Sequence, residues 1–177
     1  MADFPPPALR EAASKVASLL RERSETISVA ETAAGGLISA ALLATPGASK
    51  VYRGGATLYT LESRIAFGGW TQANIDNYSG PSPDLVAGLA KHVRGALGST
   101  YTVAESGTAG PTSSRQGANG QPGYVALAVV GENDTLAMDL NTGLGGDRSG
   151  NMVAFAVEAL KLVAEFIQKS ASQSGKI

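Results

Sequence analysis

Residues 26–43 read TISVAETAAGGLISAALL, and this stretch decides the fold. Residues 26–30 are rich in β-branched side chains, which predicts a short strand. Residues 31–36 are small and end in two glycines, which predicts a tight turn. Residues 37–43 continue as an Ala/Leu helix, which the Pro-Gly pair at 46–47 ends. A strand that leads through such a turn into a helix is typical of α/β domains.

The neighbouring segments continue the alternation of helix and strand. Apolar residues at helical spacing predict a helix over residues 9–20. Residues 54–59 predict a strand, and residues 61–67 predict a short helix. Residues 82–84, Ser-Pro-Asp, combine a cap, a first-turn proline and an acid at the positive end of the helix dipole. The helix that starts there is expected to run to about Gly98.

The second half of the chain repeats this pattern. Residues 101–104 predict a strand that feeds a long polar loop over 106–122. Residues 124–130 and 136–140 predict a β-hairpin, and residues 143–150 open a last helix whose apolar stripe packs on the sheet or on a second copy of the chain. The predicted class is therefore α/β: a three-layer α/β/α sandwich with a mixed, partly parallel sheet.

Composition limits the function classes. The 177 residues fit a single domain, with flexible ends at 1–7 and 170–177, and the 14 basic and 15 acidic residues leave no cationic surface for nucleic acid. No apolar run is long enough for a membrane span, and the first ten residues lack the features of a secretory signal. We therefore expect a cytoplasmic protein that binds neither nucleic acid nor membrane.

The chain lacks the residues that several common types of functional site require. The chain has no cysteine and one histidine, so we expect no metal site. No G-x-G-x-x-G follows the first strand and no Gly-Lys-Ser/Thr occurs, so we expect no cofactor. His92 lies at the edge of the apolar stripe of its predicted helix, formed by Leu85, Leu89, Val93 and Ala96. A packing role at the boundary of the core suits it better than a hydrolase triad.

Two strand ends resemble each other within the chain. Residues 29–35 and residues 103–110 each place a carboxylate, then a hydroxyl, then small residues at the end of a predicted strand. Ligands of open α/β sheets bind beyond the carboxyl ends of the strands. This echo predicts a site there, although two Ala/Gly-rich strand ends can also resemble each other by chance.

Five segments of the chain resemble the C-terminal domain of the competence/damage-inducible protein CinA, the family of nicotinamide mononucleotide (NMN) deamidases. These segments are residues 31–36 (ETAAGG), 45–49 (TPGAS), 53–64 (RGGATLYTLESR), 106–111 (SGTAGP) and 146–148 (GDR). The resemblance implies an α/β domain that takes a small pyridine nucleotide or a similar anion. If the domain is an enzyme, the resemblance implies an amidohydrolase.

The family's amide hydrolysis is attributed to a serine activated by a lysine, and the matching residues here are Thr32 and Arg64. A desolvated lysine can lose its proton near neutral pH, whereas arginine stays charged. Thr32 keeps a hydroxyl, but its methyl group crowds the path of attack. It also suits the N-cap of the following helix. Ala33 and Ala34 stand where the family has Cys and Thr.

Glu105 stands where the family keeps an apolar residue. If it approaches Glu31 at the strand ends, one carboxyl would have a raised pKa and could replace the lysine as general base. Alternatively, Glu105 forms a structural ion pair with Arg64 or Arg53. The candidate catalytic residues are therefore Thr32, Arg64, Glu105 and Ser106, with Thr60 and Thr108 as further candidate nucleophiles.

The same motifs also contain backbone and side-chain groups that could bind an anion. Glycines at helix starts let the backbone approach an anion, and an arginine offers a fork for phosphate or carboxylate. Glycines also serve tight packing, and a tyrosine that stacks on a heterocycle is less common than a half-buried sheet tyrosine. The candidate ligand-binding residues are Glu31, Gly35, Gly36, Tyr59, Gly107, Thr108, Gly110 and Arg148.

Three functions are compatible with these residues. The first is a domain that keeps the nucleotide-type pocket but has weak, altered or no deamidase activity. The second is a working NMN deamidase in which Thr32 attacks and another base replaces the lysine. The third is a structural or partner-binding protein, which includes a homo-oligomer built on the last helix.

Overall fold

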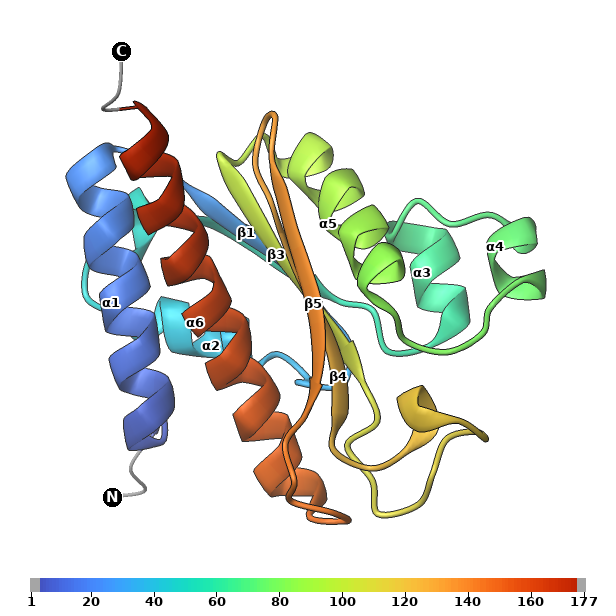
Figure 1. Cartoon of the computed structure of the whole chain (residues 1–177). Coiled ribbons are helices and arrows are strands. Elements are labelled where there is room, and N and C mark those ends of the chain that lie inside the picture. Colours follow the sequence, from blue (N-terminus) through green and yellow to red (C-terminus); the bar gives the residue numbers. More distant parts are fainter. Residues whose placement is uncertain (1–3, 175–177) are drawn as a thin grey trace.

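The computed structural model describes residues 4–174, with side chains as far as Ser170. Figure 1 shows a central sheet with helices on both of its faces. In chain order the elements are α1 (Pro7–Arg23), β1 (Ile27–Glu31), α2 (Leu37–Leu43), the 3-10 helix η1 (Ala48–Lys50), β2 (Tyr52–Thr57), α3 (Leu61–Phe67), α4 (Gln72–Asp76), α5 (Pro83–Leu97), β3 (Tyr101–Gly107), the 3-10 helix η2 (Ala118–Gly120), β4 (Tyr124–Val130), β5 (Thr135–Asn141) and α6 (Arg148–Ser174).

The sheet is mixed, as the sequence predicts. Its strand order is β2-β1-β3-β4-β5. β1 runs parallel to β2 and to β3, whereas β4 is antiparallel to both β3 and β5. Ala30 of β1 pairs with Ala56 and with Ala104, so the carboxyl ends of β1, β2 and β3 meet at one edge of the sheet. This edge carries the motifs singled out above.

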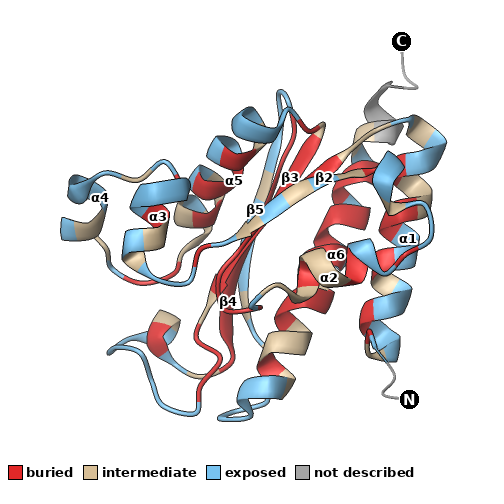
Figure 2. Ribbon diagram, turned by 180° about the vertical axis from the view of Figure 1, so that it is seen from behind, coloured by how far each residue is buried: buried red, intermediate tan, exposed pale blue. Residues whose placement is uncertain are grey.

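The two faces of the sheet carry separate apolar cores, which confirms the three-layer architecture. Side chains alternate between the faces of a strand. Val29 and Val103 belong to the core under α1, α2 and α6, while Ala30 and Ala104 belong to the core under α5. All seven residues of β4 are buried because helices cover both of its sides (Figure 2).

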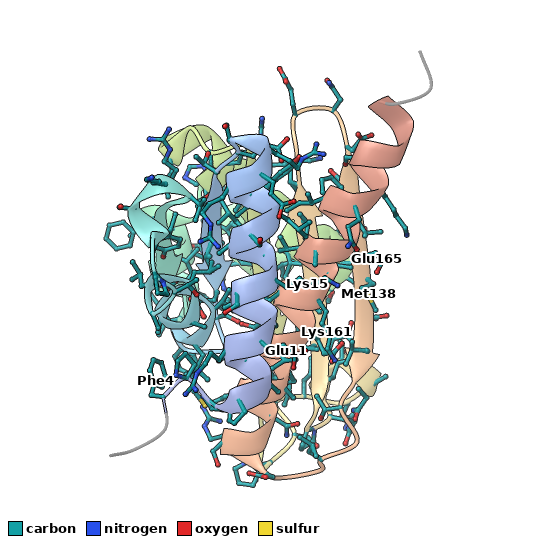
Figure 3. The ribbon with its side chains drawn as sticks, turned by 90° about the vertical axis from the view of Figure 1, so that its left-hand side faces the viewer. Phe4, Glu11, Lys15, Met138, Lys161 and Glu165 are labelled. Atoms are coloured by element: carbon teal, nitrogen blue, oxygen red, sulfur yellow. The ribbon has the colours of Figure 1, made fainter. Side chains whose placement is uncertain are left out.

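α6 packs inside the domain. Figure 3 shows it beside α1, with Glu11, Lys15, Lys161 and Glu165 on the outer side of the pair. Its apolar residues contact β3, β4, α1 and α2. The stripe that the sequence predicts is therefore covered by the sheet and by α1. Within residues 4–174, no helix is long and apolar enough to cross a membrane.

Several predicted boundaries differ from the structure. β3 continues to Gly107 because its end pairs with β4, where Gly107 lies opposite Val125. β2 covers residues 52–57 in place of 54–59. The helix α4 was not predicted because five residues are too few to show a helical pattern in the sequence. It begins at a capping box that Thr71 and Asn74 form.

Both predicted flexible ends fall partly outside the described residues. Pro7 is the first residue of α1, and residues 170–174 continue α6. Residues 1–3 and 175–177 lie outside the part of the chain that the structure describes.

Candidate functional site

Two hydroxyl groups meet at the carboxyl ends of β1 and β3. Thr32 directly follows β1, and Ser106 is the penultimate residue of β3. The Thr32 hydroxyl donates to Ser106 Oγ at 3.1 Å. The exposed fractions of the two residues are 3% and 2%. The internal echo in the sequence therefore predicts a real juxtaposition, since the hydroxyl residue that follows the carboxylate in each segment makes this contact.

Arg64 reaches the same hydroxyl pair from α3. Its Nη2 donates to Ser106 Oγ at 3.4 Å, and its Nε donates to the carbonyl oxygen of Leu58 at 3.3 Å. Its guanidinium carbon lies 5.0 Å from the ring centroid of Trp70 and 5.3 Å from that of Tyr78. Such cation–π contacts stabilise a cation most where water is excluded. The side chain expected to replace the family's lysine is thus a buried cation enclosed by aromatic rings.

Glu105 lies on the opposite face of β3 from Ser106, because successive strand residues alternate. Its Oε2 accepts the N–H groups of Thr32 at 3.0 Å and of Ala34 at 2.9 Å. The pKa of Glu105 is raised to about 7, mainly by burial and with a smaller contribution from the charge of Glu31, although the two N–H groups and Arg64 act in the opposite direction. The predicted approach of Glu31 and Glu105 thus has the electrostatic effect expected of it.

The alternative role of Glu105 as an ion-pair partner is wrong. Arg53 is exposed on β2. Arg64 forms no ion pair with any described carboxylate. Glu105 Oε1 is buried and has no hydrogen-bond partner among the described residues. Glu105 therefore holds the turn after β1 through Oε2 alone.

The turn into α2 is fixed by Glu31 and not by Thr32. The Glu31 carboxylate accepts the N–H of Ile38 at 3.1 Å, the N–H of Ser39 at 3.1 Å and the hydroxyl of Ser39 at 2.6 Å. The N-cap of α2 is Gly36, so the predicted N-cap role of Thr32 is wrong. Glu31 is fully buried, and its carboxylate stabilises the start of α2 instead of facing a ligand cavity.

The two glycines of this turn allow its backbone conformation. Gly35 and Gly36 have φ values of 68° and 99°, which residues other than glycine rarely adopt. A Cβ on Gly35 would lie 2.9 Å from the Cε of Met152 in α6. Neither glycine lines the cavity described next, so tight packing, the alternative given above, accounts for their presence.

A cavity of about 210 Å³ lies beside the hydroxyl pair. Its lining residues are Ala33, Tyr59, Gly107, Thr108, Ala109, Gly110, Thr112, Ser114 and Arg148. Ala33 and Gly107 directly follow Thr32 and Ser106 in the chain, so the hydroxyl pair lies next to the cavity wall. Five of the predicted ligand-binding residues, namely Tyr59, Gly107, Thr108, Gly110 and Arg148, meet here.

Arg148 and Tyr59 form one side of this cavity. Arg148 Nη1 donates to the carbonyl oxygen of Gly110 at 2.6 Å, and its Nη2 donates to the Tyr59 hydroxyl at 3.3 Å. The exposed fraction of Tyr59 is 61%, so this residue is not a half-buried sheet tyrosine. Its ring is available for stacking, and Arg148 keeps a cationic group at the cavity.

Of the further candidate nucleophiles, neither is free. The Thr60 side chain accepts the N–H of Ser63 as N-cap of α3. The Thr108 hydroxyl contacts Ser114 Oγ at 2.9 Å and the carbonyl oxygen of Asn119 at 3.2 Å. Both hydroxyls therefore fix local backbone.

Sequence reasoning missed Asn151, which connects the two loops around the cavity. This residue of α6 is fully buried. Its Nδ2 donates to the carbonyl oxygens of Ala109 at 2.9 Å and Gly145 at 2.8 Å, and its Oδ1 accepts the hydroxyl of Thr142. The sequence signal that could have revealed Asn151 is a polar residue within the apolar stripe, near the start of the last predicted helix.

Replacing Asn151 with Ala is expected to lower the free energy of unfolding by about 1–3 kcal/mol, because buried carbonyl groups lose their donors. Urea denaturation measures this loss. Asn133→Ala in the exposed β4–β5 turn is the matched control and is expected to have little effect. Equal losses for the two variants would show that Asn151 does not hold these loops.

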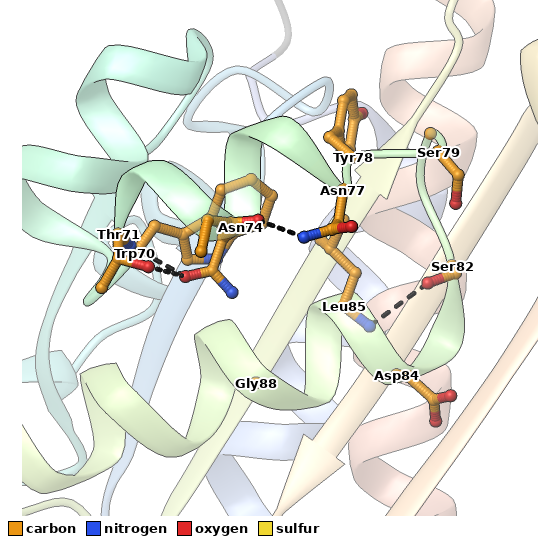
Figure 4. A pocket seen from close by; sticks show the side chains of 12 residues that line it. Trp70, Thr71, Asn74, Asn77, Tyr78, Ser79, Ser82, Asp84, Leu85 and Gly88 are labelled. Atoms are coloured by element: carbon orange, nitrogen blue, oxygen red, sulfur yellow. Dashed lines mark hydrogen bonds between the residues drawn. The ribbon is translucent and has the colours of Figure 1, made fainter.

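A larger cavity of about 450 Å³ lies between α4 and α5 (Figure 4). Trp70 and Tyr78 line it and also contact Arg64, so the two rings separate this cavity from the guanidinium. None of the predicted site residues lines it. His92 is exposed on α5, and its ring packs against Gly69. His92 is therefore a surface residue of α5 that belongs to neither apolar core, and the predicted packing role at the core boundary is not seen.

Comparisons with known sequences relate this chain to one protein family. The model of the CinA C-terminal domain family matches residues 9–167. A CinA-like protein of Prochlorococcus marinus is 34% identical over 157 residues, which are 88% of this chain and 34% of that protein. A CinA-like protein of Frankia casuarinae is 33% identical over 153 residues, which are 86% of this chain and 34% of that protein. The chain thus spans about a third of the length of these relatives.

Solved structures share the fold. The competence/damage-inducible protein CihA of Agrobacterium tumefaciens superposes with a TM-score of 0.82 at 25% identity, covering 92% of this chain and 97% of that chain. A CinA superfamily protein of Escherichia coli superposes with a TM-score of 0.78 at 22% identity, covering 93% of this chain and 92% of that chain. At this identity the similarity indicates a shared fold only. Because the family model matches most of its length, this chain belongs to the CinA C-terminal domain family.

Proposed function

We propose that this domain binds a small pyridine nucleotide or a similar anion in the cavity beside Thr32 and Ser106, and that it hydrolyses NMN slowly or not at all. The observation that carries the proposal is the buried Arg64 guanidinium, which donates to Ser106 Oγ at 3.4 Å. A group that stays protonated cannot take a proton from an attacking hydroxyl.

The other contacts of the hydroxyl pair support slow chemistry. The Thr32 hydroxyl donates to Ser106 Oγ, which also accepts from Arg64. Neither contact brings a basic nitrogen or a carboxylate to the hydroxyls. Glu105, the candidate substitute base, accepts the N–H of Thr32 and not its hydroxyl. A nucleophile needs a base within hydrogen-bond reach, and these contacts do not supply one.

The cavity supports binding. Its glycines let backbone approach a ligand closely, Arg148 offers a cationic fork, and Tyr59 offers an exposed ring. A phosphate near Arg148 and a heterocycle near Tyr59 would use both groups. The family resemblance points to the same class of ligand.

Incubation of the pure protein with NMN tests this proposal. We expect slow or undetectable release of ammonia, and we expect calorimetric titration to detect binding of a pyridine nucleotide. Ammonia release at about 10 per second, an ordinary enzymatic rate, would contradict the loss of activity. Failure to bind any pyridine nucleotide would instead favour the third function, a structural or partner-binding protein.

A further inference from the structure

The cavity of about 450 Å³ between α4 and α5 is built mainly from uncharged groups. Aromatic rings, carboxamides and hydroxyls line it, and Asp84 is the one charged residue in the described lining. Among the residues that the structure describes, no lysine, arginine or histidine lines this cavity, so it offers no counter-charge to a phosphate or a carboxylate. The carboxylate of Asp84 disfavours an anion further. The cavity therefore suits a ligand without negative charge.

The rings of Trp70 and Tyr78 form the wall between this cavity and Arg64. Both residues are half-buried, and the Arg64 guanidinium lies over one face of each ring, at 5.0 Å and 5.3 Å from the centroids. A cation is attracted by the negative face of a ring. Because Arg64 already polarises both rings, a second cation on the cavity side gains less from them. A flat, uncharged heterocycle can still stack there.

Two carboxamides beside the rings are held in fixed orientations. Asn74 Oδ1 accepts the N–H of Thr71 at 2.8 Å and its hydroxyl at 2.9 Å, so Asn74 Nδ2 stays available as a donor. Asn77 Nδ2 donates to the carbonyl oxygen of Ala73 at 2.8 Å, so Asn77 Oδ1 stays available as an acceptor. The α4 side of the cavity thus offers one oriented donor and one oriented acceptor.

The α5 side of the cavity is open at Gly88. A Cβ built on this glycine would meet no atom within 4 Å. Figure 4 shows Gly88 on α5, with Trp70, Asn74 and Asn77 on the other side of the cavity. A glycine leaves the helix backbone uncovered, so a flat ligand can approach it closely.

A nucleobase combines the features that this cavity recognises. Every base has a π face that stacks on aromatic side chains, whatever its sequence identity. Its edge carries acceptors and donors side by side, such as N7 and the amino group of adenine, which asparagine commonly reads. A free sugar has hydroxyl groups for the same carboxamides but has no π face for the rings.

We propose that the cavity between α4 and α5 binds a nucleoside through its base, with the base stacked on Trp70 and its edge bound by Asn74 Nδ2 and Asn77 Oδ1. This site goes beyond the proposed function, because no described residue lines both this cavity and the one beside Tyr59 and Arg148.

Calorimetric titration of the unaltered protein with adenosine, guanosine, cytidine, uridine and free ribose tests the proposal. We expect at least one nucleoside to bind with a dissociation constant below about 1 mM, and we expect no binding of ribose. Absence of binding for all four nucleosides would overturn the proposal. Binding of ribose as tight as that of the nucleosides would overturn it as well, because the site would then recognise a sugar.

A matched pair of variants on α5 locates the bound nucleoside. Gly88→Leu fills the cavity and is expected to fold, since leucine favours a helix over glycine. It is expected to weaken binding of the nucleoside at least about tenfold. Gly95→Leu is the control, because a Cβ there also meets no atom within 4 Å and Gly95 lies outside the cavity. This control is expected to bind like the unaltered protein. Equal affinities for the two variants would overturn the proposal.

Asn77→Ala tests the hydrogen bond to the base. Asn77 is exposed, and its loss is expected to weaken binding of the nucleoside about fivefold. Gly88→Leu is also expected to leave binding of NMN unchanged, since NMN is proposed to occupy the other cavity. If Gly88→Leu weakened binding of both ligands alike, they would share one cavity, which would overturn the proposal of a second site. Absence of NMN binding with intact nucleoside binding would contradict only the proposed function.

Discussion

The double variant Thr32→Ser/Arg64→Lys is expected to release ammonia from NMN at least about a hundredfold faster than the unaltered domain. Serine removes the methyl group that crowds the nucleophile, and lysine supplies a group that can lose its proton. Residue 64 is buried without a carboxylate partner, and desolvation lowers the pKa of a lysine in such a place. A positioned base typically contributes a factor of about 10²–10⁴ to a rate.

The single variants show whether the two groups act together. Thr32→Ser alone is expected to stay slow, since Arg64 still cannot accept the proton. Arg64→Lys alone is expected to raise the rate of ammonia release only slightly, because the methyl group of Thr32 still crowds the attacking hydroxyl. Arg53→Lys is the matched control for the charge exchange. A folded double variant that binds NMN and yet gains no activity would show that Thr32 and Arg64 are not what limits the reaction, and Ala33 and Ala34 would be the next residues to exchange.

The stability of the unaltered domain is expected to fall as the pH rises from about 4.5 to about 7, because of Glu105. The pKa of this carboxyl is raised from 4.5 to about 7 in the folded protein. The folded state therefore keeps a proton that the unfolded state has already lost. The stabilisation is fully present below pH 4.5 and is lost as the pH passes the folded pKa, by up to about 3 kcal/mol.

Urea denaturation between pH 5 and pH 8 measures this effect by comparison with Glu105→Gln. The glutamine has no charge to bury, so its stability relative to the unaltered protein is expected to increase with pH. Other titrating groups are shared by the two proteins and cancel. The exposed Glu132→Gln, in the β4–β5 turn, is expected to follow the unaltered protein. Parallel curves for all three proteins would contradict a near-neutral pKa of Glu105.

Local signals in the sequence were sufficient for most of the fold. The helices α3 and α5 begin and end near the predicted residues because a cap or a proline marks their starts and glycines follow their ends. β4 was predicted over its full length from a run of apolar residues. The prediction failed at the end of β3, where Ser106 and Gly107 were assigned to a polar loop. Pairing with β4, a contact far away in the chain, makes them part of the sheet.

The candidate site could be predicted only in part. The repeated pattern of carboxylate and hydroxyl led to Thr32 and Ser106, because parallel neighbouring strands bring such repeats together. The aromatic rings around Arg64 could not be found, since Trp70 and Tyr78 flank α4, which has no apolar period in the sequence. Asn151 was missed because its partners lie in two loops that only the tertiary structure brings together.

Thr32 and Arg64, which the family resemblance matches to its serine and lysine, lie outside both apolar cores. Thr32 and Arg64 contact hydroxyl groups, a carbonyl and ring faces at the sheet edge, whereas the cores fill the layers below. Folding and reactivity therefore depend on largely separate sets of side chains. A lineage built on this scaffold can lose its chemistry, or regain it, through a few substitutions that leave the architecture intact.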